Sequence, residues 1–212
     1  MNARTHIAGG LVAAGVALSF GFTAHPWTLV LASGFGGLVP DWDHPYSTLG
    51  RYVPWPAISR SRGPYVPPDL GRRGWPHPIW HRHQAHSLVG LLLASSVCLA
   101  LTAAVFYGFF WFVRTHWTAL LPLITAGHFL GGWILAGFLI GGISHLILDG
   151  FNMTRQWWLW PFSHHGFRWP LHASVRATDS WAFLLLVGVG LILIWHLGYS
   201  GLFPPVTSRI FP

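Results

Sequence analysis

Long apolar stretches most constrain what this chain can fold into. Five occur along its 212 residues, at 7–24, 27–39, 87–113, 117–148 and 180–197. A helix needs about 20 apolar residues to cross a bilayer. Charged residues make up only 8% of the sequence, against roughly a quarter in a soluble domain. The sequence therefore predicts an all-α, polytopic membrane protein, with residues 1–212 forming one integral membrane domain that crosses about five times.

Two of these stretches fit a simple crossing poorly. Residues 27–39 are short for a full span, and 117–148 are too long for one crossing but short for two. We interpret 117–148 as one crossing plus a bent or interfacial part, because its glycines can bend a helix. Polar loops are expected at about 41–86 and 151–179. The tryptophan-rich residues 157–162 are typical of a membrane-interface anchor.

The basic residues predict the orientation in the membrane. All 12 are arginines, and the net charge is +7. With five crossings, only Arg114 and Arg209 lie opposite the N-terminus, so the positive-inside rule places the N-terminus and both long loops in the cytoplasm. We expect this charge to contact lipid headgroups, with no nucleic acid partner. The apolar start is interpreted as a retained helix, and the single Cys98 excludes a four-cysteine zinc site.

Histidines and aspartates cluster where the apolar stretches begin or end. His145 and Asp149 are four residues apart, which places them on one face of a helix. With five crossings, all the clusters reach the same membrane face. Ionisable groups at such positions are costly and indicate function, and imidazole with carboxylate is a typical ligand set for zinc and similar ions. The candidate metal ligands, for one to three ions, are His6, Asp41, His44, His81, His86, His145 and Asp149.

Three further residues are candidates for catalysis. Arg51 and Arg82 can bind a phosphate through paired hydrogen bonds, although contact with lipid headgroups explains them equally well. Asp43 is a candidate general base. Asp179 is interpreted either as a cap of the last helix or as support for a ligand. The alternative for all these clusters is a set of polar networks at helix ends.

Four motifs, in order, resemble those of a known family. Residues 40–51 resemble "PDxDHPxSxxGR", 81–87 resemble "HRGxTHS", 141–149 resemble "GxxSHLxLD" and 160–162 match "WPF". The chain thus resembles the YdjM-like proteins of the bacterial inner membrane, described as LexA-regulated, membrane-bound, metal-dependent hydrolases. That family is similar in turn to zinc-dependent phospholipases C and single-strand nucleases. His83 and Ala85 depart from the second motif, where the family usually has Gly and Thr.

The resemblance implies a metal-dependent hydrolase. It implies zinc, or else manganese, and a phosphoester substrate, which we expect to be a lipid or lipid-linked molecule at the cytoplasmic face. The alternative is a non-enzymatic metal-binding membrane protein or a transporter. A transporter needs polar ligands near the middle of the membrane, where His128 is the main candidate. The oligomeric state stays open.

Overall fold

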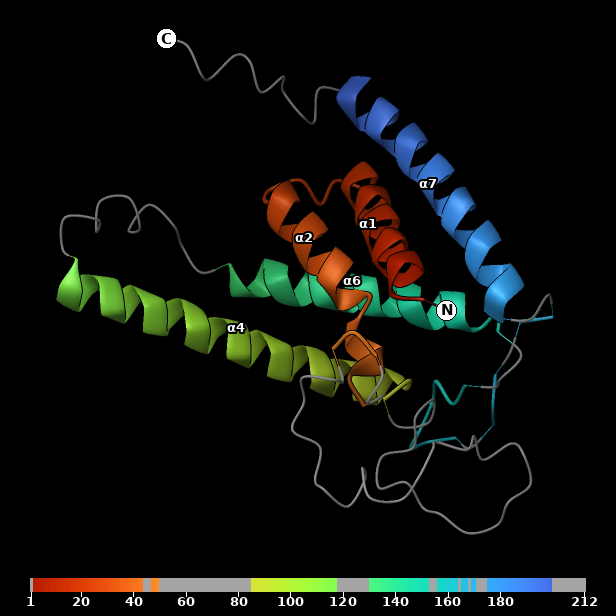
Figure 1. Ribbon diagram of the computed structural model, residues 1–212, viewed down its shortest axis with the longest axis horizontal. Helices are drawn as coiled ribbons and strands as arrows, with labels where there is room; N and C mark the ends of the chain where they lie inside the picture. Colours follow the sequence, from red (N-terminus) through yellow and green to blue (C-terminus); the bar gives the residue numbers. More distant parts are fainter. Residues whose placement is uncertain are drawn as a thin grey trace.

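The described part of the chain is helical, as predicted. The computed structural model describes residues 2–43, 47–49, 85–117, 130–152, 156–163, 165–167, 169–170 and 175–199. These residues contain no strand, apart from an isolated antiparallel bridge between Gln156 and Phe167. The elements, shown in Figure 1, are α1 (Ala3–Ser19), α2 (Pro26–Gly36), the 3-10 helix η1 (Val39–Asp43), α4 (Leu88–His116), α6 (Gly131–Asp149) and α7 (Val175–Tyr199).

Local sequence signals set several helix ends. Pro26 opens α2, where its missing N–H costs nothing. Ser87 caps α4 as the sequence predicts, since its hydroxyl oxygen accepts a hydrogen bond from the Gly90 amide at 2.9 Å. Asn2 caps α1 in the same way, through the Arg4 amide at 3.2 Å. These caps fix where the chain enters α1 and α4, next to two of the predicted ligands.

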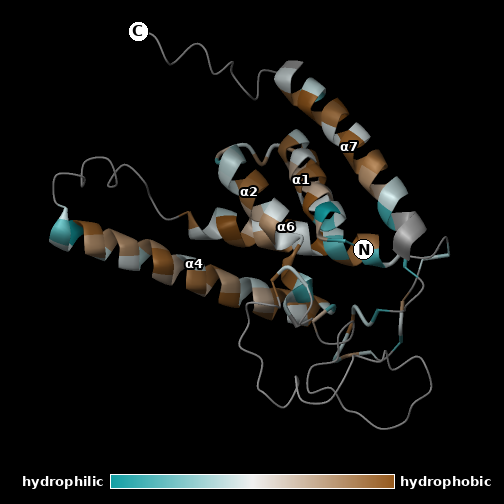
Figure 2. Cartoon of the chain, viewed as in Figure 1, coloured by the Kyte–Doolittle hydropathy of each residue, from teal (hydrophilic) through white to brown (hydrophobic). Residues whose placement is uncertain are grey.

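Within the described residues, three helices are long and apolar enough to cross a membrane: Leu88–His116, Gly131–Asp149 and Asp179–Gly198. Figure 2 shows the hydrophobic residues along them. α1 has 17 residues and α2 has 11, or about 26 and 17 Å at 1.5 Å per residue. The hydrocarbon core is about 30 Å thick. The membrane class is therefore supported, whereas five crossings are not confirmed.

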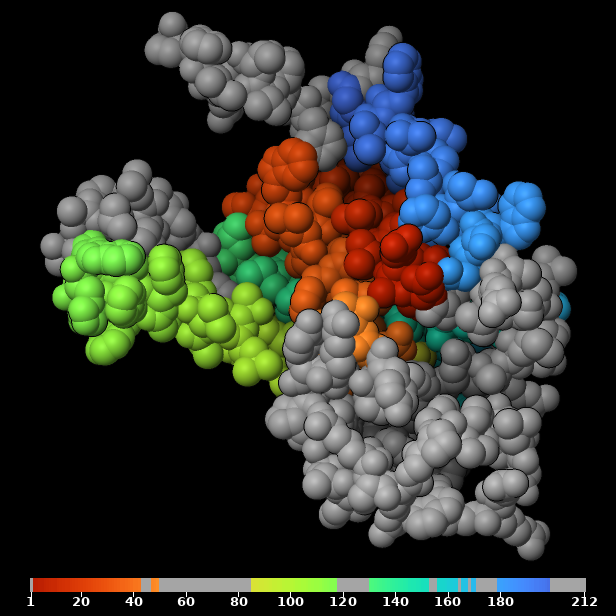
Figure 3. Space-filling view, in the orientation of Figure 1, coloured from red at the N-terminus to blue at the C-terminus, as the bar shows by residue number. Residues whose placement is uncertain are grey.

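The helices are arranged around α6. α1 and α2 form an antiparallel hairpin that packs on α6, α4 packs on α6 and η1, and α7 packs on α1 (Figure 1). In Figure 3 the far ends of α4 and α7 reach beyond the central bundle. Their outer residues are large and apolar, for example Val105 (72% exposed) and Trp195 (77% exposed). Surfaces of this kind are suited to contact with lipid.

Glycines allow α2 and α6 to approach backbone to backbone. A Cβ atom at Gly141 would overlap the Ser33 carbonyl oxygen, and one at Gly36 would meet the backbone of Phe138. The Ser33 hydroxyl in turn donates a 2.8 Å hydrogen bond to the Gly10 carbonyl on α1. α6 is one continuous helix through these glycines. They serve packing there, and the bent or interfacial part of 117–148 stays a prediction, since residues 118–129 lie outside the described part.

Replacing Gly141 by alanine is expected to destabilise the protein. The added methyl group would force α2 away from α6, and overpacking of this kind costs about 1–3 kcal/mol. Gly108→Ala is the matched control, because Gly108 lies within α4 with nothing within 4 Å of the added carbon. Thermal unfolding of the detergent-solubilised variants measures both effects. Equal melting temperatures for the two variants would contradict the close packing.

Candidate metal centre

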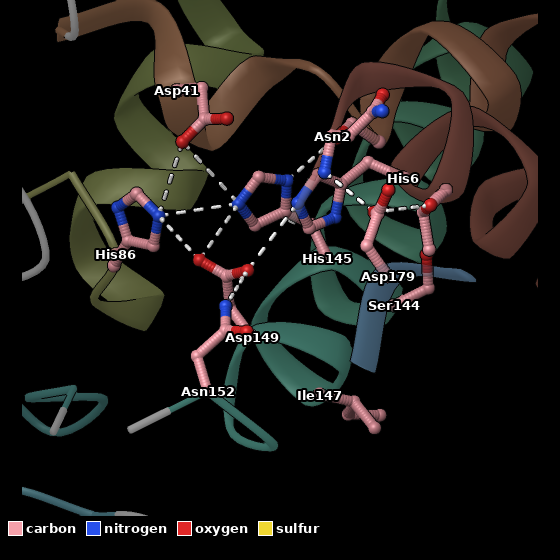
Figure 4. Close-up of polar contacts among 12 residues, drawn as sticks. Asn2, His6, Asp41, His86, Ser144, His145, Ile147, Asp149, Asn152 and Asp179 are labelled. Atoms are coloured by element: carbon pink, nitrogen blue, oxygen red, sulfur yellow. Dashed lines mark hydrogen bonds and ion pairs between the residues drawn. The ribbon is translucent and has the colours of Figure 1, made fainter. Parts of the chain in front are cut away.

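Five of the predicted residues meet at one end of the bundle. His6 comes from the first turns of α1, Asp41 from η1, His86 from the turn before α4, and His145 and Asp149 from the end of α6. Figure 4 shows their side chains facing one another. His6, His86, His145 and Asp149 are 0–2% exposed, whereas Asp41 is 24% exposed. These residues form a buried His/Asp cluster that could hold a metal ion.

The ring of His145 is held in one orientation. Its Nδ1–H donates a 2.7 Å hydrogen bond to the carbonyl oxygen of Gly37, which follows α2. The other nitrogen, Nε2, is therefore the one available to an ion. Such a bond from the far nitrogen fixes the tautomer and the ring plane of metal-binding histidines. Close packing of α2 on α6 thus directs His145 Nε2 into the cluster.

The carboxylate of Asp149 lies in the middle of the cluster. Its Oδ1 accepts a 2.8 Å hydrogen bond from Asn152 Nδ2 and lies 3.4 Å from His6 Nε2. Its Oδ2 lies 3.6 Å from His86 Nε2 and 3.8 Å from His145 Nε2. The two oxygens therefore face different histidines, and Asn152 holds the carboxylate in that rotation.

Each of four donor atoms in the cluster lies 3.2–3.8 Å from at least two of the others. They are His86 Nε2, His145 Nε2, Asp41 Oδ1 and Asp149 Oδ2. His86 lies 3.2 Å from His145 and 3.4 Å from Asp41, and the distances above extend the range to 3.8 Å. Tetrahedral zinc has bonds of about 2.0–2.2 Å to nitrogen and oxygen, so its ligand atoms lie about 3.3–3.6 Å apart. The spacing within the group of Asp41, His86 and His145, 3.2–3.6 Å, is suited to a zinc-sized ion.

His6 extends the cluster on the other side of His145. The two rings stack, with centroids 3.6 Å apart, and within the described residues neither nitrogen of His6 makes a hydrogen bond. His6, His145 and Asp149 form a second group of potential ligands that overlaps the first at His145. Since Nδ1 of His145 is engaged by Gly37, the two groups compete for the same nitrogen.

The electrostatics of the cluster favour a positive charge at its centre. Burial alone would lower the pKa of the His86 imidazole, but hydrogen bonds with Asp149 and Asp41 raise this pKa to about 9. Burial also opposes ionisation of Asp41, yet its interactions with His145 and His86 hold its pKa well below the usual range. Without an ion, a proton on His86 offsets part of the negative charge of the two carboxylates, and a metal cation can replace that proton.

The remaining candidates lie outside the described residues. These are His44, Arg51, His81 and Arg82, together with the side chain of Asp43, whose backbone ends η1. Their roles stay predictions.

The sequence did not predict three contacts around the cluster, made by Asn152, by the Gly37 carbonyl and by Asp179. Asn152 carries a signal, since an amide three residues after a candidate ligand can reach it across one turn, but the Gly37 carbonyl carries none. The capping interpretation of Asp179 is wrong, because α7 begins at Val175. Asp179 instead accepts hydrogen bonds from the Thr5 hydroxyl (2.6 Å) and the Asn2 amide (2.8 Å), and so joins α7 to the start of α1.

The tryptophan-rich segment supports the turn that carries His86. The Trp158 carbonyl accepts a 2.9 Å hydrogen bond from the Leu88 amide. The Trp158 ring packs on the apolar cluster that contains Val39 and Leu91. Phe162, by contrast, is 87% exposed, as a membrane-interface anchor would be. The segment therefore contains both a packing residue and an exposed aromatic residue.

The fold and the cluster define a helical membrane protein with a buried His/Asp centre suited to a metal ion. The chain belongs to the YdjM inner membrane protein family, whose family model matches residues 1–204. No curated protein and no solved structure was found to match the chain. The family confirms the resemblance carried by the four motifs.

Removing a central donor should abolish metal binding. We expect purified protein to bind zinc, and His145→Ala to lose it, because His145 Nε2 belongs to both ligand groups. His116→Ala is the matched control, since His116 is exposed at the far end of α4. Elemental analysis of the detergent-solubilised proteins gives the ion content. Equal zinc in both variants would contradict the site.

Removing the support of Asp149 should weaken metal binding without abolishing it. Asn152→Ala leaves every donor in place but releases the Asp149 carboxylate, and losses of such supporting contacts typically weaken metal affinity about 10–100-fold. Competition with a coloured chelator measures the affinity. Ser163→Ala, in the same segment, removes only an exposed hydroxyl that accepts a hydrogen bond from the His165 amide, and should leave the affinity unchanged. An unchanged affinity in Asn152→Ala would rule out this supporting role.

Proposed function

We propose that the protein is a membrane-bound metal-dependent hydrolase that cleaves a phosphoester of a lipid or lipid-linked molecule at the cytoplasmic face. The buried His/Asp cluster, with its two overlapping groups of potential metal ligands, carries this proposal. Zinc fits the donor types and their spacing, and manganese is the alternative. An ion bound there would activate water and stabilise negative charge on a phosphoryl group.

The position of the cluster supports a lipid-linked substrate. His145 and Asp149 lie in the last turns of α6, and His86 lies just before α4. Both helices are apolar enough to cross a membrane, so their ends come to the level of the headgroups, where lipid phosphates lie. Under the positive-inside rule, the arginine-rich loops favour the cytoplasmic side for this end of the bundle.

The remaining catalytic roles follow from the sequence. Arg51 and Arg82 would bind the phosphate through paired hydrogen bonds, and Asp43 would accept a proton from the attacking water. His44 and His81 would act as additional ligands or hold ligands in place. His6 would hold an ion together with Asp149.

A second candidate function is non-enzymatic metal binding. His86 and His145 are fully buried, as ligands of a structural zinc ion often are, whereas catalytic sites keep one position open. The ion would then only join α4, α6 and η1. A transporter is less favoured, because the described His/Asp donors gather at one end of the bundle.

Hydrolysis assays distinguish these functions. The zinc-loaded protein should hydrolyse bis(p-nitrophenyl) phosphate, p-nitrophenyl phosphate or a short-chain phospholipid. Activity should disappear with a chelator and return with zinc or manganese. His86→Ala should be inactive, while His116→Ala should remain active. Stoichiometric zinc without hydrolysis of any of these substrates would favour the structural role.

A further inference from the structure

We propose that Asp179 is a positioning residue of the metal centre, which holds the start of α1 so that the imidazole of His6 faces Asp149. This inference rests on the proposed function, whose metal centre it extends to the last helix, α7. Asp179 belongs to neither of the two groups of potential ligands. It acts through hydrogen bonds to α1 and does not touch the ion.

The direction of the His6 ring depends on the position of its backbone. The side chain is 1% exposed, and within the described residues neither ring nitrogen makes a hydrogen bond. The ring stacks on that of His145, with centroids 3.6 Å apart, and its Nε2 lies 3.4 Å from Asp149 Oδ1. His145, by contrast, is oriented by its 2.7 Å hydrogen bond to the Gly37 carbonyl. The His6 nitrogen therefore faces Asp149 only while the first turn of α1 stays in place.

One carboxylate oxygen of Asp179 holds that turn at two points. Its Oδ1 accepts a 2.6 Å hydrogen bond from the hydroxyl of Thr5, the residue before His6, and a 2.8 Å hydrogen bond from the Asn2 amide (Figure 4). The Asn2 carbonyl in turn accepts hydrogen bonds from the amides of Thr5 at 3.1 Å and His6 at 3.2 Å. The backbone of His6 is thus connected to Asp179 through a single residue.

Burial and charge both favour this contact. Helix ends fray readily, and His6 is only the fourth residue of α1. The side chain of Thr5 is 1% exposed, so its hydroxyl would have little access to water if Asp179 moved away, and an unpaired buried hydroxyl is costly. A carboxylate beside the first turn also interacts favourably with the positive end of the helix dipole. These interactions keep the start of α1 folded beside the cluster.

Zinc affinity in a double-mutant cycle tests this role without an activity assay. The full-length, detergent-solubilised protein is titrated with zinc in competition with a coloured chelator. The cycle consists of the wild type, Thr5→Val, His6→Ala and the double variant. Thr5→Val exchanges the hydroxyl for a methyl group. Asp179→Ala and Asp179→Asn test the other partner, because the asparagine oxygen can still accept both hydrogen bonds.

Leu193→Ala is the control for helix packing alone. Leu193 lies on α7 against Gly15, toward the other end of α1. Its truncation should weaken the packing of α7 on α1 and leave the contact at Asp179 in place. Thermal unfolding of all variants measures this effect separately from zinc affinity.

Four results are expected. Thr5→Val and Asp179→Ala each weaken zinc binding about tenfold, the lower end of the loss that is typical for supporting contacts. His6→Ala weakens it at least as much, and adding Thr5→Val to His6→Ala changes the affinity no further, because the hydroxyl acts through His6. Asp179→Asn keeps the affinity of the wild type. Leu193→Ala lowers the melting temperature and leaves the affinity unchanged.

Three results would overturn the inference. A lower melting temperature with unchanged affinity in Thr5→Val and Asp179→Ala would reduce their contact to helix packing. Equal weakening by Thr5→Val with and without His6 would show that the hydroxyl does not act through His6. An unchanged affinity in His6→Ala would show that His6 does not contribute to binding. If Asp179→Ala does not fold, Thr5→Val alone decides the test.

The outcome is separable from the proposed function, because zinc affinity is measured without a substrate. Coupling between Thr5 and His6 in a protein that hydrolyses nothing leaves the inference standing. Hydrolysis by a protein in which the two residues are not coupled leaves the function standing.

Discussion

The structure depends on a group of buried ionisable side chains whose charges and hydrogen bonds must offset one another. Asp149 is buried, and a carboxylate in that position is tolerated only where opposite charge and hydrogen-bond donors surround it. Three imidazoles and the Asn152 amide provide them, with Asp149 Oδ1 between His6 and Asn152 and its Oδ2 toward His86 and His145. The cluster therefore requires several helix ends to meet within hydrogen-bonding distance, and this requirement explains much of the architecture.

Glycine packing meets that requirement. The small residues of α2 and α6 bring the two backbones into contact, and Gly37 sits against the carbonyl oxygen of His6 on α1. Three segments thus converge where Gly37 also orients His145. Helix association in lipid relies on such close contact, because an apolar side chain gains little when it exchanges lipid chains for another helix. The same glycines that join the helices therefore determine the direction of a donor nitrogen.

The sequence predicted the helices and the donor residues, but not the contacts that hold the donors in place. Apolar length predicted the helices. The positions of His6, Asp41, His86, His145 and Asp149 at the ends of the spans predicted their meeting place, because ionisable groups at membrane depth are costly and indicate function. Apolar length could not decide whether α1 and α2 cross the membrane, since a short apolar stretch can be shielded by protein as well as by lipid. The Gly37 carbonyl and the role of Asp179 could not be predicted. A backbone oxygen has no sequence signature, and an aspartate near a helix start resembles a cap wherever its partner lies.

The packing of α2 on α6 also has a consequence during synthesis. α2 ends at Gly36 and α6 begins at Gly131, so about 95 residues are made between the two. At about 5–20 residues per second, this takes about 5–20 seconds. Throughout that interval the glycine face of α2, His6 and Asp41 lack the helix that shelters them. The polar groups of the hairpin therefore stay exposed until α6 has been made, and only then can α1, α2 and α6 close around the cluster.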